Sequence, residues 1–383
     1  MNVGVLGGGQ LGRMLGLAGQ PLGFSFVFLD PAEECPAAAA GAWIRAGFDD
    51  TSALRELAER SDVVTYEFEN VPVAAVHAIA EQRSVLPPAT SLEASQDRLR
   101  EKEFFTRLGI ATPRFEAVEG QASLARAVER IGLPAVLKTR RLGYDGRGQR
   151  VLRDARDLSP ALAALGEWPL LLEALVPFER ELSLLAVRAR SGECAFYPLV
   201  ENHHREGILR LSLAPAPGLV PALQARAEDC ARRAMEALGH VGVLALELFQ
   251  CDDELLANEL APRVHNSGHW TIEGAATSQF ENHLRAIAGL SLGSTAVRGH
   301  WAMVNLIGEV RDLGAVSGAP GTHVHLYGKR PRPLRKLGHI TLCADDAETL
   351  ARRVEALWRM LGEAAGPMPE CGGRRPGTTS LLA

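Results

Sequence analysis

The chain lacks an excess of positive charge and lacks any close pair of cysteines. Its 41 lysines and arginines are outnumbered by 46 acidic residues, which gives a formal net charge of -5. No overall positive field is available to hold a nucleic-acid backbone, so a small-molecule partner is favoured. The absence of a C-x-x-C pair favours isolated reduced thiols over disulfides or a zinc site, as expected of a cytoplasmic protein. The six cysteines are Cys35, Cys194, Cys230, Cys251, Cys343 and Cys371.

Long apolar runs are also missing. The leucine run at residues 170–172 ends in charge, well short of the roughly 18 residues that a membrane span needs. At the start of the chain, Met1 and Asn2 lead directly into a short apolar stretch and a glycine cluster, without the pattern of a signal peptide. We therefore expect a soluble protein whose partners include neither membranes nor nucleic acids.

Lysine is scarce. Only four of the basic residues are lysines, and all the others are arginines. A compact ammonium group is not replaced by the planar guanidinium fork where a site needs a point charge. Each lysine is therefore a candidate for a specific role, although a rare lysine can equally be a remnant without function. The four are Lys102, Lys138, Lys329 and Lys336.

The length of 383 residues and the hydrophobic content of 46% allow a sizeable core divided between two or three domains. The first part reads strand, glycine turn, helix, strand, helix, strand. This βαβαβ order is typical of a doubly wound parallel α/β sheet. The predicted strands are residues 3–6, 26–29 and 62–66, and the predicted helices begin at Leu11 and Leu54.

The middle of the chain changes to hairpin-connected strands, which predicts an α+β unit with antiparallel pairing. We divide the chain into a doubly wound domain at 1–94, a central domain at 95–298 with a small lid subdomain at about 112–178, a C-terminal domain at 299–365 and a flexible tail at 366–383. The predicted strands cover residues 135–138, 149–152, 170–173, 181–187, 241–249, 255–260, 303–307, 323–327 and 339–343, and the helices cover 222–238 and 347–361.

Gly7, Gly9 and Gly12 form a G-x-G-x-x-G turn after the first strand, and Asp30 ends the second strand. In dinucleotide-binding proteins such glycines let a pyrophosphate approach a helix N-terminus, and the acid binds a ribose hydroxyl. The motif alone is weak. The glycines can also serve only the tight turn, or hold a substrate phosphate.

The second glycine loop is more specific. Three glycines fall within residues 143–148, between two strands, and Lys138 ends the strand that enters the loop. Glycines let main-chain N–H groups converge on phosphate oxygens, while a lysine supplies the point charge. The Walker A pattern is absent. We therefore predict a glycine-rich lid over a triphosphate, with an ordinary flexible hairpin as the alternative.

Two carboxylates are predicted to face each other across a hairpin. Alternation in residues 243–248 places Glu247 on the face opposite to the leucines, and a three-residue turn at 252–254 pairs Glu247 with Glu259. Such carboxylates repel unless a cation lies between them. Mg²⁺ suits the position because it takes one or two carboxylates with waters and substrate phosphates. Two solvated surface glutamates are the alternative.

Two further segments are polar. The loop at residues 262–270 carries five hydrogen-bonding side chains just before a helix, which predicts an anion or substrate cradle, with a capped loop as the alternative. The basic run at residues 329–336 is, on its own, typical of a solvated edge, because no aromatic residues are interleaved to bind nucleic acid.

Three of these segments resemble the signatures of one enzyme family. Residues 6–14, 138–149 and 258–270 are similar, in this order, to the ATP-grasp superfamily and within it to the N5-carboxyaminoimidazole ribonucleotide synthase family. The resemblance covers roughly residues 1–362, and its most specific part is 263–270. It implies an ATP-grasp fold with an N-terminal doubly wound preATP-grasp domain and a small C-terminal domain.

The resemblance also implies roles for individual residues. It gives catalytic roles to Lys138, Tyr144, Arg147, Arg263, His265 and Lys329, with His265 as a candidate proton acceptor. The implied ATP contacts are Arg98, Lys138, Gly143, Tyr144, Asp145, Gly146, Arg147, Gly148, Gln149, Glu173, Ala174, Leu175, Val176, Glu181, His204, Asn258 and Glu259. The implied ribonucleotide contacts are Gln10, Glu67, Tyr144, Arg147, Arg263, His265, Asn266, Ser267, Lys329 and Arg335. The implied Mg²⁺ ligands, for two ions, are Glu247 and Glu259.

The implied reaction is the ATP-dependent carboxylation of 5-aminoimidazole ribonucleotide with bicarbonate, through carboxyphosphate, in purine biosynthesis. The resemblance also implies a homodimer. Other ATP-grasp ligases, such as a formate-using glycinamide ribonucleotide transformylase or a biotin carboxylase, are alternatives within the fold. A nicotinamide-dependent oxidoreductase built on the first glycine motif and a nucleotide-binding regulatory protein without turnover are alternatives of other classes.

Overall fold

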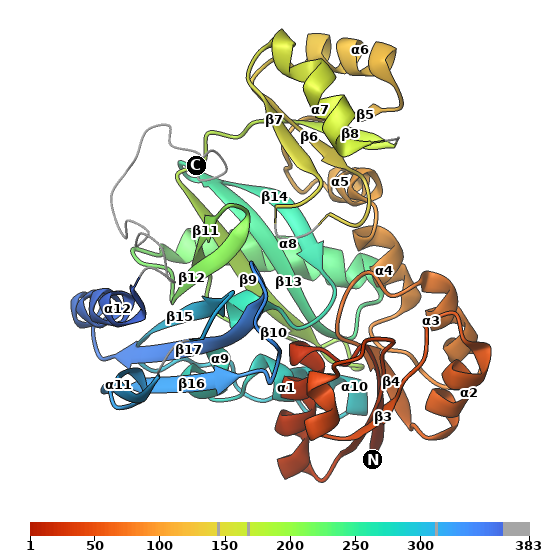
Figure 1. The fold of residues 1–383 in the computed structure, drawn as a ribbon, viewed down its shortest axis with the longest axis vertical. Coiled ribbons are helices and arrows are strands. Elements are labelled where there is room, and N and C mark those ends of the chain that lie inside the picture. Colours follow the sequence, from red (N-terminus) through yellow and green to blue (C-terminus); the bar gives the residue numbers. More distant parts are fainter. Residues whose placement is uncertain (144–145, 167–168, 311–312, 363–383) are drawn as a thin grey trace.

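The computed structural model describes residues 1–143, 146–166, 169–310 and 313–362. These residues form three sheets, with the large sheet in the middle of the molecule and a small sheet projecting from it at the top of the view (Figure 1). Within the described ranges, no helix combines the length and the apolar character that crossing a membrane requires.

The N-terminal sheet has four parallel strands in the order β3-β2-β1-β4, which confirms the predicted doubly wound arrangement. Strand β3 is absent from the sequence prediction because three residues are too few to show an alternating pattern. The strands are β1 (Asn2–Leu6), β2 (Ser25–Leu29), β3 (Ala42–Ile44) and β4 (Val63–Tyr66). The helices are α1 (Gln10–Gly19), η1 (Gln20–Leu22), η2 (Pro36–Ala39), α2 (Thr51–Glu59), α3 (Val73–Ala80) and α4 (Ala89–Ser95).

The small sheet is antiparallel, in the order β5-β8-β6-β7, and has an apolar core of its own. The predicted hairpin around the second glycine loop is formed by β6 and β7. The strands are β5 (Phe115–Val118), β6 (Ala135–Thr139), β7 (Gln149–Leu152) and β8 (Leu170–Ala174). The helices are α5 (Arg98–Arg107), which leads into this unit, α6 (Gln121–Ile131), η3 (Ala155–Asp157) and α7 (Leu158–Leu165).

The large sheet follows the order β14-β13-β9-β11-β12-β15-β17-β16, with β10 paired to the side of β9. Its last three strands come from residues after 299, and β15 pairs directly with β12. The strands are β9 (Arg180–Arg188), β10 (Cys194–Phe196), β11 (Val200–Arg205), β12 (Ile208–Ala214), β13 (Gly242–Cys251), β14 (Glu254–Ala261), β15 (His300–Ile307), β16 (Thr322–Leu326) and β17 (Lys336–Ala344). The helices are α8 (Pro221–Leu238), η4 (Asn266–Gly268), α9 (Thr271–Gly274), α10 (Gln279–Ala288), α11 (Gly314–Ser317) and α12 (Ala347–Leu361).

The two faces of β9 and β13 pack against different helices because their side chains alternate. Leu244 and Leu246 belong to the apolar cluster that includes α8, as the predicted alternation requires. Val243 and Ala245 belong to the cluster that includes α1 and α10. The N-terminal domain therefore packs on the face of the large sheet that also carries Glu247.

Two buried histidines join β13 and the segment before it to the N-terminal domain. His283 accepts from the main-chain N–H of Val243 (3.1 Å) and hydrogen bonds Thr65 on β4 (2.9 Å). His240 hydrogen bonds the hydroxyl of Ser91 on α4 (3.0 Å). Burial lowers the pKa of His240 to about 4 and that of His283 to about 3.

Acid is therefore expected to destabilise the fold already at pH values above those at which carboxylates titrate. Below pH 6.5 the unfolded chain binds a proton at each of these histidines, whereas the folded chain does not, so the free energy of unfolding falls as pH falls from 6.5 to about 4. Each histidine contributes up to about 1.4 kcal/mol per pH unit. In urea unfolding across this range, His283→Gln should show a shallower pH dependence, and the exposed control His77→Gln the wild-type one. Equal slopes in the three proteins would contradict the assignment.

Candidate active site

A cavity of about 1100 Å³ opens where the three sheets meet. Its walls come from the first glycine turn, the β6–β7 loop, one face of the large sheet and the basic segment at residues 329–336. Single ligands usually occupy pockets of about 300–1,000 Å³. The cavity is thus large enough for a nucleotide together with a second substrate.

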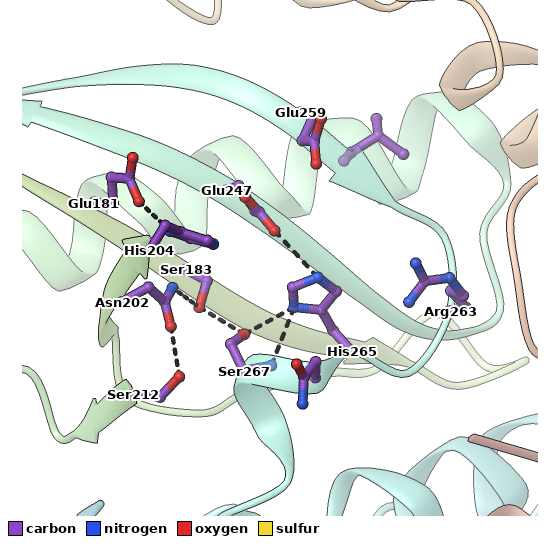
Figure 2. Close-up of polar contacts among 12 residues, drawn as sticks. Glu181, Ser183, Asn202, His204, Ser212, Glu247, Glu259, Arg263, His265 and Ser267 are labelled. Atoms are coloured by element: carbon purple, nitrogen blue, oxygen red, sulfur yellow. Dashed lines mark hydrogen bonds and ion pairs between the residues drawn. The ribbon is translucent and has the colours of Figure 1, made fainter. Parts of the chain in front are cut away.

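A row of polar side chains crosses this otherwise apolar face of the large sheet. Glu259 on β14 lies opposite Glu247 on β13, which lies opposite Ser183 on β9. Asn202 on β11 and its neighbour Ser212 on β12 continue the row. Figure 2 shows these side chains together above the strands. Buried polar groups at this density need partners, so the row marks the functional face of the sheet.

The predicted pairing of Glu247 with Glu259 is confirmed, but the predicted three-residue turn is wrong. Cys251 pairs with Glu254, so only two residues form the turn, and Asp252 adopts a left-handed φ of 52° within it. A bulge then shifts the register, because Leu248 pairs with Ala257 while Glu247 pairs with Glu259. The extra residue in β14 is Asn258. The bulge therefore brings the two carboxylates opposite each other and directs a third polar residue to the same place.

These three residues offer oxygen atoms to a cation. Burial raises the pKa of Glu247, but the hydrogen bond from His265 and the nearby basic side chains of His265, His204 and Arg263 together outweigh it and lower the pKa to about 2, so this carboxylate is charged. The side-chain oxygen of Asn258 is buried and has no hydrogen-bond partner. Among the described residues no group of three or more His, Cys, Asp or Glu side chains could hold a metal. Two carboxylates and an amide fit Mg²⁺, which leaves its other positions to waters and phosphates.

Two lysines meet one buried glutamate beside this pair. Lys138 on β6 donates to Glu173 on β8 (2.8 Å), and Lys102 on α5 lies 3.7 Å from the same carboxylate. Burial raises the pKa of Glu173, but the two lysines outweigh it and lower the pKa to about 2. Lys102 also donates to the main-chain oxygen of Asn258 (2.7 Å). Lys102 is a residue that the sequence reasoning missed, and its only signal was the scarcity of lysine.

The second glycine loop closes on the turn between β11 and β12. At Gly146, with φ of 74°, an added Cβ would lie 2.8 Å from the main-chain oxygen of Glu206, so only glycine fits this approach. Arg98 connects the glycine loop to β14, because it donates to Glu259 (2.9 Å) and to the main-chain oxygen of Gly143 (3.4 Å). The predicted residues Tyr144 and Asp145 lie outside the described residues.

The first glycine turn is filled by a side chain of the protein itself. The carboxylate of Glu67, just after β4, accepts from the main-chain N–H groups of Gly9 and Gly12, the latter at 2.6 Å. An added Cβ at Gly7, which has a φ of 106°, would lie 2.4 Å from the Cγ of Glu67. Burial raises the pKa of Glu67. Neither a dinucleotide pyrophosphate nor a substrate phosphate fits a turn that already holds a carboxylate.

The basic segment is a wall of the cavity rather than a solvated edge. Lys329 donates to the side-chain oxygen of Gln10, and burial lowers the pKa of Lys329 to about 8. Arg335 pairs with Glu34 of the N-terminal domain (3.0 Å), which also pairs with Arg330 (2.9 Å). Glu34 anchors this segment across almost 300 residues of sequence, and no local pattern predicts it.

The loop after β14 presents three of the predicted residues to the cavity. Arg263 pairs with Glu69 from the loop after β4. His265 donates to Glu247 across 3.1 Å, and Asn266 exchanges two hydrogen bonds with Asn305 on β15. Glu69 and Asn305, like Glu34, were not predicted because each meets its partner only in the folded chain.

At the far end of the row, His204 on β11 pairs with Glu181 on β9. Burial lowers the pKa of His204, but Glu181 outweighs it and raises the pKa to about 9. At neutral pH the pair is therefore an imidazolium facing a carboxylate. Both residues line the cavity.

Most of the predicted residues are brought together. Those lining the cavity are Gln10, Glu67, Arg98, Lys138, Gly143, Gly146, Arg147, Gln149, Glu181, His204, Glu247, Asn258, Glu259, Arg263, His265, Asn266, Lys329 and Arg335. Six other predicted residues that the structure describes do not line it: Gly148, Glu173, Ala174, Leu175, Val176 and Ser267.

Comparison with known protein families matches three successive parts of the chain. The ribonucleotide synthetase preATP-grasp domain matches residues 1–96, the ATP-grasp domain matches residues 103–280, and the phosphoribosylaminoimidazole carboxylase C-terminal domain matches residues 302–353. The N5-carboxyaminoimidazole ribonucleotide synthase of Pseudomonas aeruginosa is 56% identical, over 93% of this chain and 99% of its own length. That of Bacillus subtilis is 38% identical, over 93% and 95%.

Solved structures give the same result. The crystal structure of N5-carboxyaminoimidazole ribonucleotide synthetase from Thermus thermophilus has a TM-score of 0.90 and 57% identity, covering 96% of this chain and 99% of that one. The Aspergillus clavatus enzyme in complex with ADP and 5-aminoimidazole ribonucleotide has a TM-score of 0.85 and 33% identity, covering 93% and 97%. The chain therefore belongs to the N5-carboxyaminoimidazole ribonucleotide synthase family of ATP-grasp ligases and carries out the ATP-dependent carboxylation of 5-aminoimidazole ribonucleotide in purine biosynthesis.

Proposed function

We propose that this chain uses Mg-ATP to activate bicarbonate as carboxyphosphate and transfers the carboxyl group to the exocyclic amine of 5-aminoimidazole ribonucleotide. One observation carries the proposal: the cavity joins the paired carboxylates and Lys138 at one end to Arg263, Lys329 and Arg335 at the other. An oxygen of bicarbonate attacks the γ-phosphorus and ADP leaves. The amine nitrogen then attacks the carboxyl carbon, phosphate leaves, and the nitrogen loses one proton.

At the nucleotide end, the protein supplies positive charge and a closed surface. Lys138 and Arg98 line the cavity and are proposed to contact the phosphates, with the glycine loop at residues 143–149 proposed to cover them. Charge that develops on the transferred group would then be stabilised and water kept out. The segment at the end of β8 (Glu173, Ala174, Leu175 and Val176) is proposed to receive the adenine through its main chain, and Glu181 with His204 the ribose.

Glu247, Glu259 and Asn258 are the residues that would hold Mg²⁺. Bound there, Mg²⁺ supplies charge neutralisation for the transferring phosphoryl group. The protein contributes the register of the hairpin, which holds the two carboxylates opposite each other before substrate arrives. The family resemblance implies two such ions, which these residues would hold together with waters and substrate phosphates.

At the ribonucleotide end, fixed cations face a small anionic substrate. Arg263 and Arg335 are each held by a carboxylate, Glu69 and Glu34 respectively, so their guanidinium groups are oriented in advance. Lys329 is half-buried against Gln10, and Glu67 closes the glycine turn behind them. We assign Gln10, Glu67, Tyr144, Arg147, Asn266 and Ser267 to the same substrate.

The test is ADP release with Mg-ATP and bicarbonate, measured with and without 5-aminoimidazole ribonucleotide. A sharp rise with the ribonucleotide, together with an acid-labile carboxylated product, supports the proposal. ADP release that ignores the ribonucleotide but responds to formate or biotin would contradict it. Omission of bicarbonate and of Mg²⁺ tests these two components separately, and each omission should abolish turnover.

Lys329→Met should weaken the use of the ribonucleotide while ATP binding survives. A part-buried ammonium that contacts a substrate anion is worth about 2–3 kcal/mol, so we expect KM for the ribonucleotide to rise about 30- to 150-fold. Steady-state kinetics with each substrate varied in turn separates the two affinities. Arg330→Met, in the same segment but outside the cavity lining, is the matched control. A fall in ATP affinity instead would show that Lys329 serves the nucleotide.

We also propose that the protein is a cytoplasmic homodimer. The family resemblance supports the dimer, and the unpaired cysteine pattern supports a reducing compartment. Sedimentation equilibrium at micromolar concentration would show the mass of two chains, and the mass of one chain would contradict the dimer.

A further inference from the structure

A buried chain of hydrogen bonds leads from the middle of the large sheet to His265. The hydroxyl of Ser183 lies 2.8 Å from that of Ser267, and the side-chain nitrogen of Asn202 lies 2.9 Å from Ser183. Ser212 donates to the side-chain oxygen of Asn202 (2.8 Å). All four side chains are at least nine-tenths buried. Figure 2 shows the chain ending at the ring of His265, whose other nitrogen faces Glu247.

The end near His265 determines which group donates and which accepts in each of these hydrogen bonds. His265 caps the short helix η4, and its Nδ1 accepts from the main-chain N–H of Ser267 (3.4 Å). An N–H group cannot point at a second N–H, so Nδ1 carries a lone pair. The hydroxyl of Ser267, 2.9 Å away, then donates its single proton to Nδ1 as well.

The remaining bonds follow from this assignment. Because the hydroxyl of Ser267 donates its proton to His265, its oxygen must accept a hydrogen bond from Ser183. Ser183 in turn accepts from the amide nitrogen of Asn202, whose oxygen accepts from Ser212. The hydroxyls of Ser183 and Ser267 therefore each donate once and accept once, and the hydroxyl of Ser212 donates once. The opposite direction would leave the N–H of Ser267 facing a protonated Nδ1.

We propose that Ser183 and Asn202 are positioning residues that hold His265 as the tautomer with its proton on Nε2, donating to Glu247. Pairing of β9 with β13 fixes this tautomer, because it places Ser183, which donates to Ser267, directly opposite Glu247. For its effect on catalysis the proposal rests on the proposed function of the His265 loop. In this tautomer Nε2 is a donor, so His265 orients a carboxylate of the cation site and does not take the proton of the substrate amine.

The first measurement needs no substrate. Protein labelled with ¹⁵N in its histidine rings is examined by NMR at pH 8 in metal-free buffer, and the signals of His265 are identified by their loss in His265→Gln. We expect Nε2 to be protonated and Nδ1 to be unprotonated. A proton on Nδ1 of His265, in the neutral ring or in an imidazolium, would overturn the proposal whatever the variants show.

The second measurement interrupts the chain of hydrogen bonds. Ser183→Ala removes a hydroxyl with little change in volume, so Ser267 no longer receives a proton and both tautomers become accessible. We expect Nδ1-protonated His265 to appear in the spectrum and kcat/KM for the ribonucleotide to fall about tenfold, while KM for ATP stays close to wild type. Unchanged tautomer and kinetics would overturn the proposal.

Ser91→Ala is the matched control, because Ser91 is equally buried and bonds a different histidine, His240. It should lose a similar amount of stability and leave both the His265 signals and the kinetics unchanged. A loss of ribonucleotide efficiency in this control equal to that in Ser183→Ala would show that the effect is only one of stability. The expected tautomer without ribonucleotide-dependent ADP release would support the positioning and contradict the proposed function.

Discussion

Replacing Glu259 by glutamine should leave the protein folded and lower its ATP-dependent turnover about 100- to 1,000-fold. The substitution keeps the shape of the side chain but removes one of two opposed negative charges that would bind Mg²⁺. It also places an N–H₂ group where Arg98 now donates to a carboxylate (2.9 Å). Loss of a preorganised charge that stabilises the transferring group costs about 3–4 kcal/mol.

The measurement is ADP release at saturating ribonucleotide over a series of Mg²⁺ concentrations. Glu254→Gln, the same change at an exposed position of the same strand, is the control and should behave like the wild type. The unfolding midpoint in urea checks that Glu259→Gln is folded. Near-normal turnover at low Mg²⁺ in a folded Glu259→Gln protein would refute the assignment of this residue to the cation.

The acidic pair shows how far the sequence could predict the site. Alternation in β13 is enough to place Glu247 on the face away from the leucines, because a strand has a side-chain period of two. Its register against β14 is not determined in this way. The turn is one residue shorter than predicted, and the bulge at Asn258 compensates. A bulge leaves no local pattern in a single sequence, so the correct pairing was predicted from an incorrect turn.

The residues that were not predicted share one property: their partners are distant in the sequence. Ser183 reads as an ordinary polar residue in an apolar strand, yet it contacts Ser267, 84 residues away. Glu34 meets Arg335 across 301 residues. The first glycine turn was ambiguous for the same reason, since only the fold shows that Glu67 fills it. Periodicity reports on which face a residue occupies, whereas ion pairs between domains depend on the packing of those domains.

Lys102 is the clearest such case, and its environment predicts the largest effect on stability. Its ammonium group is fully buried between Glu173 (3.7 Å) and the main-chain oxygens of Asn258 (2.7 Å) and Ala257 (3.3 Å). It therefore ties helix α5 to β14 and to β8 of the small sheet. Burial lowers the pKa of Lys102, and the carboxylate of Glu173 opposes this.

Lys102→Met is expected to lower the free energy of unfolding by about 3 kcal/mol at pH 7. Methionine matches the length of the stem, so the loss comes from a buried carboxylate that keeps only Lys138 and from the main-chain oxygen of Asn258, which loses the ammonium group as its donor. The main-chain oxygen of Ala257 keeps the hydroxyl of Thr112 as a donor (2.9 Å). Urea unfolding at pH 7 measures the loss, and Glu103→Met, at an exposed position of the same helix, is the control. A loss no larger than that of the control would show that the ion pair contributes nothing to folding.

The same variant has a pH signature that separates the ion pair from simple packing. The pKa of Glu173 lies at about 2 in the folded protein and near 4.5 when it is free, so its contribution to stability is present above pH 4.5 and disappears as pH falls through 2. Without Lys102 this pKa rises toward its ordinary value. The difference in stability between wild type and Lys102→Met should therefore shrink as pH falls below about 4.5. A difference that stays constant down to pH 3 would assign the loss to packing of the lysine stem instead of to its charge.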